Sequence, residues 1–290
     1  MKPARFDYFA PTEIQEAVSL LEEYGDNAKV LAGGQSLMPL LNMRLSRPSV
    51  IVDINRIDEM AYVEENPDGG LRIGALTRQR TLERLPLVKE RIPLLAAAIP
   101  YIGHFQIRNR GTVGGSIAHA DPSGELPAMS VALGAEFILT GTAGQRTVKV
   151  EDFFLTYFTT ALEPTELFTE IRIPPWPSGA GWGFEEVSRR QGDFALAGVA
   201  ATVQLDGNGT CTNASIAVFG VGDTPVRADR AEDALSGRRI DAKALEEMAK
   251  LVSEDLEPDS DIHASAEYRK EVGGVMARRA VQAALARVRH

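Results

Sequence analysis

The first part of the chain combines one amphipathic pattern with two short apolar runs. Apolar residues recur at helical spacing over 14–25, and Thr12 followed three residues later by Gln15 predicts a capping box at the start of this helix. Polar residues scarcely interrupt 29–31 and 50–54, so both segments are predicted to be buried strands. Helix and strand therefore alternate from the beginning of the sequence.

Two glycine-rich segments each lie ahead of a predicted helix. Ala32-Gly-Gly-Gln-Ser36 follows the first strand and precedes a helix expected over 37–44, which Ser36 is placed to cap. The second segment, 106–116, is predicted to be a loop that opens toward a helix at 126–133. The same order of loop and helix thus occurs twice.

Extended patterns dominate the middle of the chain around one helical region, which is expected over 81–102. Strands are predicted at 71–74, 136–140, 146–150 and 167–173. The only segment dense in proline, Pro174-Pro-Trp-Pro177, is the best candidate for a domain boundary.

Beyond this boundary the pattern is that of an antiparallel meander backed by helices. Asp206-Gly-Asn-Gly209 joins two apolar runs and is a strong hairpin signal. Strands are predicted at 183–188, 197–205 and 210–219, and helices at 242–252 and 268–288. The C-terminal part is therefore predicted to be α+β.

The pairs Gly33-Gly34 and Gly114-Gly115 are the most specific chemical feature of the sequence. Glycine permits positive φ and lets a ligand approach the backbone, so successive N–H groups can bind an anion. Two such segments that converge, with Ser36 and Ser116 nearby, would suit a pyrophosphate. Neither has the G-x-G-x-x-G or P-loop spacing, and each pair alone is equally compatible with a simple turn.

Composition and charge exclude several classes of function. The 290 residues carry 31 Lys plus Arg against 40 Asp plus Glu, a net charge of −9 that disfavours binding to nucleic acid or anionic membranes. Cys211 is the only cysteine and the four histidines lack metal-ligand spacing, so neither an iron–sulfur cluster nor another metal is expected on this chain. Without a signal-peptide core or an apolar run of membrane-spanning length, a cytoplasmic protein is expected.

Three segments resemble, in order and spacing, the motifs of one family. They are Ala32-Gly-Gly-Gln-Ser-Leu-Met-Pro-Leu-Leu-Asn-Met-Arg44, Ile107-Arg-Asn-Arg-Gly-Thr-Val-Gly-Gly-Ser-Ile-Ala-His-Ala-Asp-Pro-Ser-Gly-Glu-Leu-Pro127 and Arg189-Arg-Gln-Gly-Asp-Phe-Ala195. The family is the FAD-binding medium subunit of molybdenum hydroxylases, which includes xanthine dehydrogenase and aerobic carbon monoxide dehydrogenase. The resemblance runs nearly from end to end.

The resemblance implies an α+β protein with the FAD-binding fold of the vanillyl-alcohol oxidase (PCMH) type. Two α/β subdomains, 1–56 and 57–176, would precede a C-terminal domain over 177–290 that consists of an antiparallel sheet backed by helices. The residues that it places at the cofactor are Ala32, Gly33, Gly34, Gln35, Ser36, Thr112, Gly114, Gly115, Ser116, Asp121, Glu125 and Phe194. No catalytic residue and no metal ligand are implied.

Several of these residues have simpler interpretations. Asp121 and Ser123 could cap the following helix, and Glu125 could complement its dipole. Phe194 stands where carbon monoxide dehydrogenases carry Tyr and could equally belong to the core. Gln35 stands where those enzymes often have His.

By resemblance, the chain is the electron-transferring flavoprotein of a heterotrimeric molybdenum hydroxylase that pairs into a heterohexamer. Its FAD would take electrons from [2Fe-2S] clusters on a small subunit, while molybdopterin and the substrate pocket lie on a large subunit. A quinone, NAD or oxygen would be the acceptor. Two alternatives stay open, namely a self-sufficient FAD-dependent oxidoreductase of the same fold and an assembly subunit without cofactor.

Overall fold

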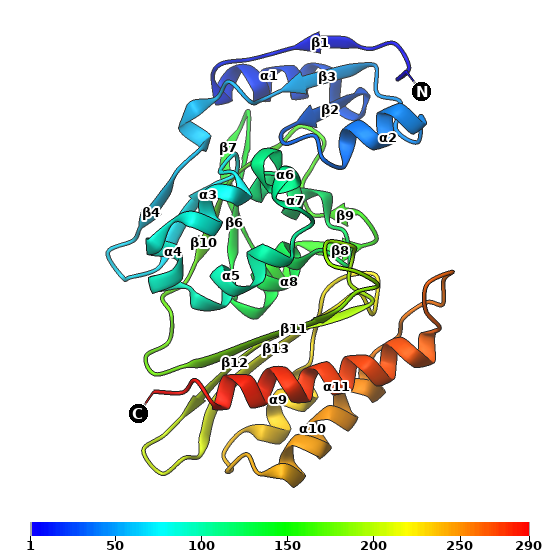
Figure 1. Cartoon of the computed structure of the whole chain (residues 1–290). Helices are drawn as coiled ribbons and strands as arrows, with labels where there is room; N and C mark the ends of the chain where they lie inside the picture. The colour runs from blue at the N-terminus through cyan, green and yellow to red at the C-terminus, as the bar shows by residue number, and fades with distance from the viewer. Residues whose placement is uncertain (1, 290) are drawn as a thin grey trace.

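A computed structural model describes residues 2–289 as three units that follow one another along the molecule (Figure 1). The N-terminal unit is a parallel sheet of three strands in the order β1-β3-β2, whose neighbours pair in parallel register. Its elements are β1 Asp7–Phe9, α1 Ile14–Tyr24, η1 Gly25–Asn27, β2 Ala28–Leu31, α2 Leu37–Met43 and β3 Val50–Asp53. The predicted helices and strands of this region are confirmed, and β1 is an addition.

Both capping predictions for this unit are wrong. The residue before α1 is Glu13 without a side-chain cap, and the N–H of Thr12 bonds to the Glu16 carboxylate at 3.0 Å instead of pairing with Gln15. Ser36 precedes α2 but makes no capping bond, because its φ of −101° and ψ of −46° are already helical. A capping serine needs an extended backbone to turn its oxygen toward the free N–H groups.

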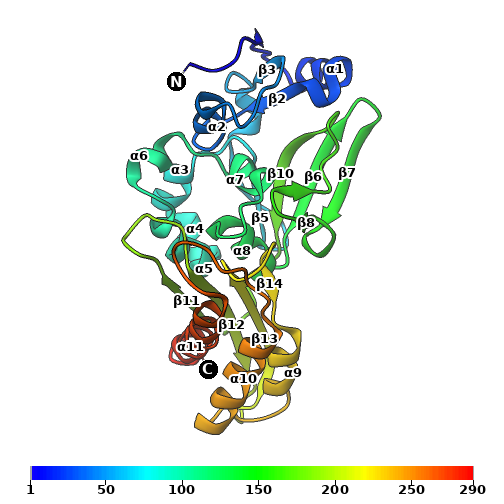
Figure 2. The same cartoon turned by 90° about the vertical axis from the view of Figure 1, so that its right-hand side faces the viewer.

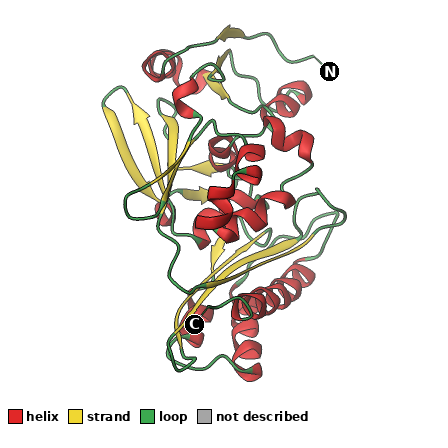
Figure 3. Cartoon of the chain, turned by 60° about the vertical axis from the view of Figure 1, so that its left-hand side comes forward, coloured by secondary structure: helices red, strands yellow, loops and turns green. Residues whose placement is uncertain are grey.

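The middle unit is an antiparallel sheet in the order β4-β5-β10-β6-β7. Its helices gather on one side of the sheet (Figure 3). The strands are β4 Val63–Glu65, β5 Leu71–Gly74, β6 Glu136–Gly141, β7 Gly144–Lys149 and β10 Leu167–Ile173, with a small hairpin of β8 Phe154–Thr156 and β9 Thr159–Thr160. The helices are η2 Asp58–Met60, α3 Gln79–Arg84, α4 Pro86–Arg91, α5 Pro93–Ala98, η3 Ile99–Tyr101, α6 Phe105–Arg110, α7 Val113–His119, α8 Glu125–Ala132 and η4 Val150–Asp152.

Two sequence predictions for this unit need correction. The single helix expected over 81–102 is a series of short helices, because Pro86, Pro93 and Pro100 each lie in the first turn of a new one. The loop expected over 106–116 is largely helical, since α6 and α7 occupy most of it. The four strands predicted for this region are confirmed.

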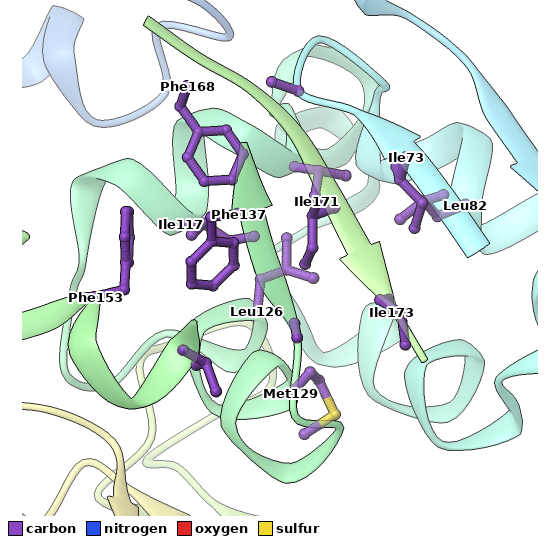
Figure 4. Packing of buried hydrophobic residues seen from close by; sticks show 14 of the residues in the cluster. Ile73, Leu82, Ile117, Leu126, Met129, Phe137, Phe153, Phe168, Ile171 and Ile173 are labelled. Carbon is purple, nitrogen blue, oxygen red and sulfur yellow. The ribbon is translucent and has the colours of Figure 1, made fainter. Parts of the chain in front are cut away.

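Aromatic packing fixes α7 and α8 against this sheet. Phe137 on β6 lies 4.3 Å from Phe153 and 5.4 Å from Phe168, between ring centroids. Ile117 of α7 and Leu126 of α8 point into the same cluster (Figure 4). Burial of these apolar side chains, each worth about 1.5–3 kcal/mol, holds both helices in place.

The C-terminal unit is an antiparallel sheet in the order β11-β12-β13-β14 with helices on its outer face (Figure 2). The predicted meander, its 206–209 hairpin and both final helices are confirmed. The elements are β11 Gly181–Val187, β12 Ala197–Leu205, β13 Cys211–Phe219, β14 Val226–Arg227, α9 Asp229–Leu235, α10 Ala242–Asp255 and α11 Ala266–Leu285.

Helix α11 lies directly on the backbone of β11. A Cβ atom at Gly181 or Gly183 would overlap the carbonyl oxygens of Ala284 and Ala280. Because side chains alternate along a strand, Trp182, Phe184 and Glu186 then face the middle unit. Phe184 confirms this orientation, since its ring lies 4.8 Å from that of Tyr101 in η3.

Candidate functional site

The first glycine segment, Ala32–Ser36, turns between β2 and α2 with open backbone donors. Within the described residues, the N–H groups of Gly33, Gly34, Gln35 and Ser36 donate no hydrogen bond. Gly34 has a φ of +71°, and the Gln35 side-chain amide donates to the Gly33 carbonyl at 3.0 Å, which closes the turn. A row of free amides around a residue of positive φ is a backbone arrangement that binds anions.

The second glycine segment lies directly against the first. A Cβ atom at Gly33 would be 2.5 Å from the carbonyl oxygen of Arg110 and 2.8 Å from Cα of Gly111. A Cβ atom at Gly115 would be 3.5 Å from Cβ of Ala32. The two glycine pairs therefore meet in space, and Figure 2 shows the N-terminal unit seated over α6 and α7.

The second segment does not, however, present free amides. Gly114 and Gly115 lie inside α7, and the N–H groups of 113–116 are all bonded within the chain. The N–H of Val113 donates to the carbonyl of Thr77 at 3.0 Å, and that of Gly114 to the carbonyl of Ala75 at 2.8 Å. The N–H groups of Gly115 and Ser116 donate to Oγ1 and the carbonyl of Thr112, at 3.1 Å and 3.2 Å. The expectation that both glycine segments offer free amides is wrong, because the N–H groups of the second segment already donate within α7 and to the main chain after β5.

Two arginines beside the first segment were not anticipated from the sequence. Arg78 donates to the carbonyl of Arg110 at 2.5 Å and to Asn55 Oδ1 at 2.7 Å, while the Asn55 amide donates to the carbonyl of Ala32 at 2.7 Å. Neither arginine forms an ion pair in the part of the chain that is described. Burial and the charge of Arg110 lower the pKa of Arg78, so a nearby anion would stabilise both guanidinium groups.

The turn between α7 and α8 carries two acids. Asp121 Oδ1 accepts the N–H of Ser123 at 2.9 Å, and α8 begins after Gly124 without a side-chain cap. The helix-cap interpretation of Asp121 and Ser123 is therefore wrong, because they close the turn instead. Burial raises the pKa of Glu125 to about 7, and the charge of Asp121 adds to this shift.

Glu186 on β11 joins these acids from the C-terminal unit. Burial, followed by the charge of Glu125, raises the pKa of Glu186 to about 8. Its Oε2 atom is buried and has no hydrogen-bond partner among residues 2–289. No pattern in the sequence marks this residue as functional, since a Glu in a strand is by default solvated.

Phe194 lies in the segment between β11 and β12 with 63% of its side chain exposed, which excludes a core role. Asp193 pairs at 3.1 Å with both Arg189 and Arg190, so these charges are neutralised locally. Gly192 approaches His104, where a Cβ would lie 2.5 Å from the imidazole Cε1. The segment that carries Phe194 is thus held against the middle unit.

The buried acid Glu125 makes the stability of the chain depend on pH. Its folded pKa of about 7 lies above the unfolded value near 4.3, so the unfolded state releases the proton first. We expect the contribution of Glu125 to the free energy of unfolding to fall as pH rises from about 4.3 to about 7, by roughly 3 kcal/mol. Urea unfolding at pH 5 and pH 8 measures this change.

Glu125→Gln should lose the part of this pH dependence that belongs to Glu125, while the part that belongs to Glu186, whose pKa is about 8, remains. Glu185→Gln, on the opposite face of β11, should keep the full wild-type dependence. Equal pH dependence in the wild type and Glu125→Gln would show that Glu125 ionises normally.

Neither a metal site nor a membrane-spanning helix is found in the part of the chain that the structure describes. Within residues 2–289, no group of three or more His, Cys, Asp or Glu side chains is placed to hold a metal ion. No helix over 2–289 is both long and apolar enough to cross a bilayer.

Two family models together match nearly the whole chain. One, described as the FAD binding domain in molybdopterin dehydrogenase, matches 4–176. The other, described as the CO dehydrogenase flavoprotein C-terminal domain, matches 182–284.

Relatives of similar length support the same family. The chain is 41% identical to the 6-hydroxypseudooxynicotine dehydrogenase complex subunit alpha of Paenarthrobacter nicotinovorans, over 100% of this chain and 97% of that one. It is 40% identical to the carbon monoxide dehydrogenase medium chain of Hydrogenophaga pseudoflava, over 99% of both.

Solved structures match over the same extent. A chain of carbon monoxide dehydrogenase from Hydrogenophaga pseudoflava superposes with a TM-score of 0.97 at 42% identity and covers 100% of both chains. A chain of quinoline 2-oxidoreductase from Pseudomonas putida 86 gives 0.93 at 37% identity, over 99% of both.

Proposed function

Because the chain belongs to the family of FAD-binding medium subunits of molybdenum hydroxylases, we propose that it carries the electron-transferring FAD of a three-subunit oxidoreductase. Electrons would come from [2Fe-2S] clusters on a small subunit and leave for an external acceptor. The substrate would be oxidised at a molybdopterin centre on a large subunit. The FAD itself supplies electron transfer, and the protein binds and orients it.

The observation that carries this proposal is the amide row at Gly33–Ser36. The main chain of Arg110 lies against this turn and accepts a hydrogen bond from Arg78 at 2.5 Å, and the charges of Arg110 and Asp53 act on Arg78. The site therefore combines directional N–H groups with positive charge that Asp53 offsets in part. That combination fits the pyrophosphate of a dinucleotide. The residues of this chain therefore fit the cofactor that the family binds.

The other predicted contacts have distinct tasks in the proposal. Thr112, Gly114, Gly115 and Ser116 would form the close wall beside the pyrophosphate, since Gly115 faces Ala32 without a side chain between them. Asp121 and Glu125 would hold polar groups of the nucleotide at the turn before α8. Phe194, which is largely exposed, would lie against the isoalloxazine ring.

A heterohexamer in the cytoplasm remains our expectation for the assembly, with a quinone, NAD or oxygen as acceptor. The test is to purify the chain alone and with its large and small partner subunits, then identify released flavin and quantify iron and molybdenum. We expect FAD on the single chain, and iron and molybdenum only in the complex. A flavin reduced directly by an organic substrate in the single chain would instead establish the self-sufficient oxidoreductase.

Phe194→Ala is expected to keep FAD bound while changing its environment. The exposed ring adds little to folding, so the free energy of unfolding should change by no more than is usual for a surface substitution, about 0.5 kcal/mol. The flavin absorbance bands and midpoint potential should shift, because the ring no longer shields the isoalloxazine. Spectra and redox titration measure both.

Ile262→Ala is the matched control, since Ile262 is 94% exposed and lies outside the predicted cofactor contacts. If Phe194→Ala and Ile262→Ala gave the same spectrum and potential as the wild type, Phe194 would not contact the flavin.

A further inference from the structure

The strand β11 turns one carboxyl group toward the interface between the C-terminal and middle units. Gly183 faces α11, so Phe184 and Glu186 face the other way, toward the middle unit, where Phe184 contacts Tyr101 of η3. Glu186 Oε2 is buried and has no hydrogen-bond partner within residues 2–289. A buried carboxylate without a partner is unstable, whereas the protonated acid is not.

The rings of Phe184 and Phe219 make the face of the sheet around Glu186 apolar. Glu186 pairs across the ladder with Gly198, which in turn pairs with Phe219. The Phe219 ring occupies the space where a Cβ of residue 198 would stand, and its centroid lies 5.9 Å from that of Phe184. Glu186 is half-buried overall, and the phenyl rings of Phe184 and Phe219 lie on the face of the sheet where its Oε2 atom is buried without a partner.

The turn between α7 and α8, which carries Asp121, contacts the C-terminal sheet at the end where Glu186 lies. Gly220, directly after β13, donates its N–H to the carbonyl of Pro122 at 2.9 Å. Helix α8 packs on β12 and β13, and its first residue, Glu125, is only 6% exposed. The charge of Glu125 acts on Glu186, in keeping with two carboxyls that lie near each other where α8 packs on the sheet.

Among residues 2–289, no cation forms an ion pair with either of these two acids. Arg108 is the positive group that acts on Glu125, but it is bonded to Glu83 at 2.9 Å and to the carbonyl of Ile102 at 2.9 Å. Asp121 adds negative charge. Burial lowers the pKa of His119, which therefore favours its neutral form. Tyr101 of η3, which packs on Phe184, is a further titratable group on the elements that face this side of β11.

We propose that Glu125 and Glu186 form a carboxyl pair that holds a proton at neutral pH and takes up a proton from water when negative charge reaches the bound flavin. The flavin part of this inference rests on the proposed function, which places Glu125 at the cofactor. Glu186 is then a positioning residue that acts through Glu125. Each electron that arrives adds negative charge nearby, and this raises the proton affinity of both carboxyls.

The first test needs no cofactor. Infrared spectra of the isolated chain, recorded at a series of pH values, show the carbonyl stretch of protonated carboxyl groups. We expect part of this signal to persist at pH 7 in the wild type and to be smaller in Glu186→Gln, where Glu125, with its pKa of about 7, is the only member of the pair left to hold a proton. Glu185→Gln, one residue away on the opposite face of β11, should retain it. An unchanged signal in Glu186→Gln would overturn the carboxyl pair.

The second test uses the complete complex with FAD bound. The midpoint potential of the flavin should fall more steeply with pH between about pH 6 and pH 9 in the wild type than in Glu186→Gln. Glu186→Asp, which keeps the carboxyl, should restore part of the slope, as a merely structural role would not. If Glu186→Gln does not fold, Glu125→Gln removes the other half of the pair and should give the same flattened curve.

The outcomes separate this inference from the proposed function. Bound FAD with coincident potential curves for the wild type and Glu186→Gln would overturn the inference alone. A chain that binds no FAD at all would overturn the proposed function, and the flavin part of the inference with it.

Discussion

Replacing Gly33 by alanine is expected to weaken FAD binding by roughly 10- to 100-fold, which corresponds to about 1–3 kcal/mol of strain. The new Cβ would lie 2.5 Å from the Arg110 carbonyl oxygen and 2.8 Å from Cα of Gly111. Both are backbone atoms, so neither can rotate away. The turn at Gly33–Ser36 must move off the second segment, which displaces its free amides from the site of the pyrophosphate.

Titration of apo-protein with FAD, followed by flavin fluorescence, measures this loss. Gly207→Ala is the matched control, because Gly207 lies in the 206–209 hairpin and its Cβ would meet nothing within 4 Å. We expect that variant to bind FAD like the wild type. Tight binding by Gly33→Ala would refute the assignment of this turn to the cofactor.

The second large effect is expected on stability, at the contact between β11 and α11. In Gly183→Ala the new methyl group would overlap the carbonyl oxygen of Ala280, so the helix has to lift from the strand. Overpacking of this kind costs about 3 kcal/mol. The melting temperature should drop by roughly 6–12 °C, by the scaling for domains of comparable size.

Gly141→Ala serves as the control for a glycine in a strand, because its Cβ would meet only ordinary contacts at 3.6 Å or more. Differential scanning calorimetry of both variants gives the comparison. If the two melted together, α11 would not depend on direct contact with the β11 backbone.

The sequence allowed prediction of those elements whose patterns are long and locally determined. The strands Ala197–Leu205 and Cys211–Phe219 were predictable because long apolar runs flank a strong hairpin turn. Asp7–Phe9 was not, because three residues with mostly exposed side chains form a strand only through pairing with Val50–Asp53, more than 40 residues away. Long-range pairing leaves no trace in local periodicity.

The same limit applies to the candidate site. The two glycine pairs pointed correctly to segments that meet, but only the structure shows that the amides of Gly114 and Gly115 are already bonded. Arg78 joins the site through a bond to the Arg110 carbonyl, a contact between distant parts of the chain. Glu186 was missed because the face that it occupies is set by the packing of Gly183 on α11.

The amide row at Gly33–Ser36 has a consequence for evolutionary change in this protein. Its donors are main-chain groups, which every residue except proline supplies, so the identity of Ser36, which makes no capping bond, is under weak selection for anion binding. What selection must retain is the shape of the turn, namely the positive φ of Gly34, the missing Cβ of Gly33 and the bond from the Gln35 side chain to the Gly33 carbonyl. Substitutions tolerated over time should accumulate at 36, while the two glycines persist even as the surrounding sequence drifts.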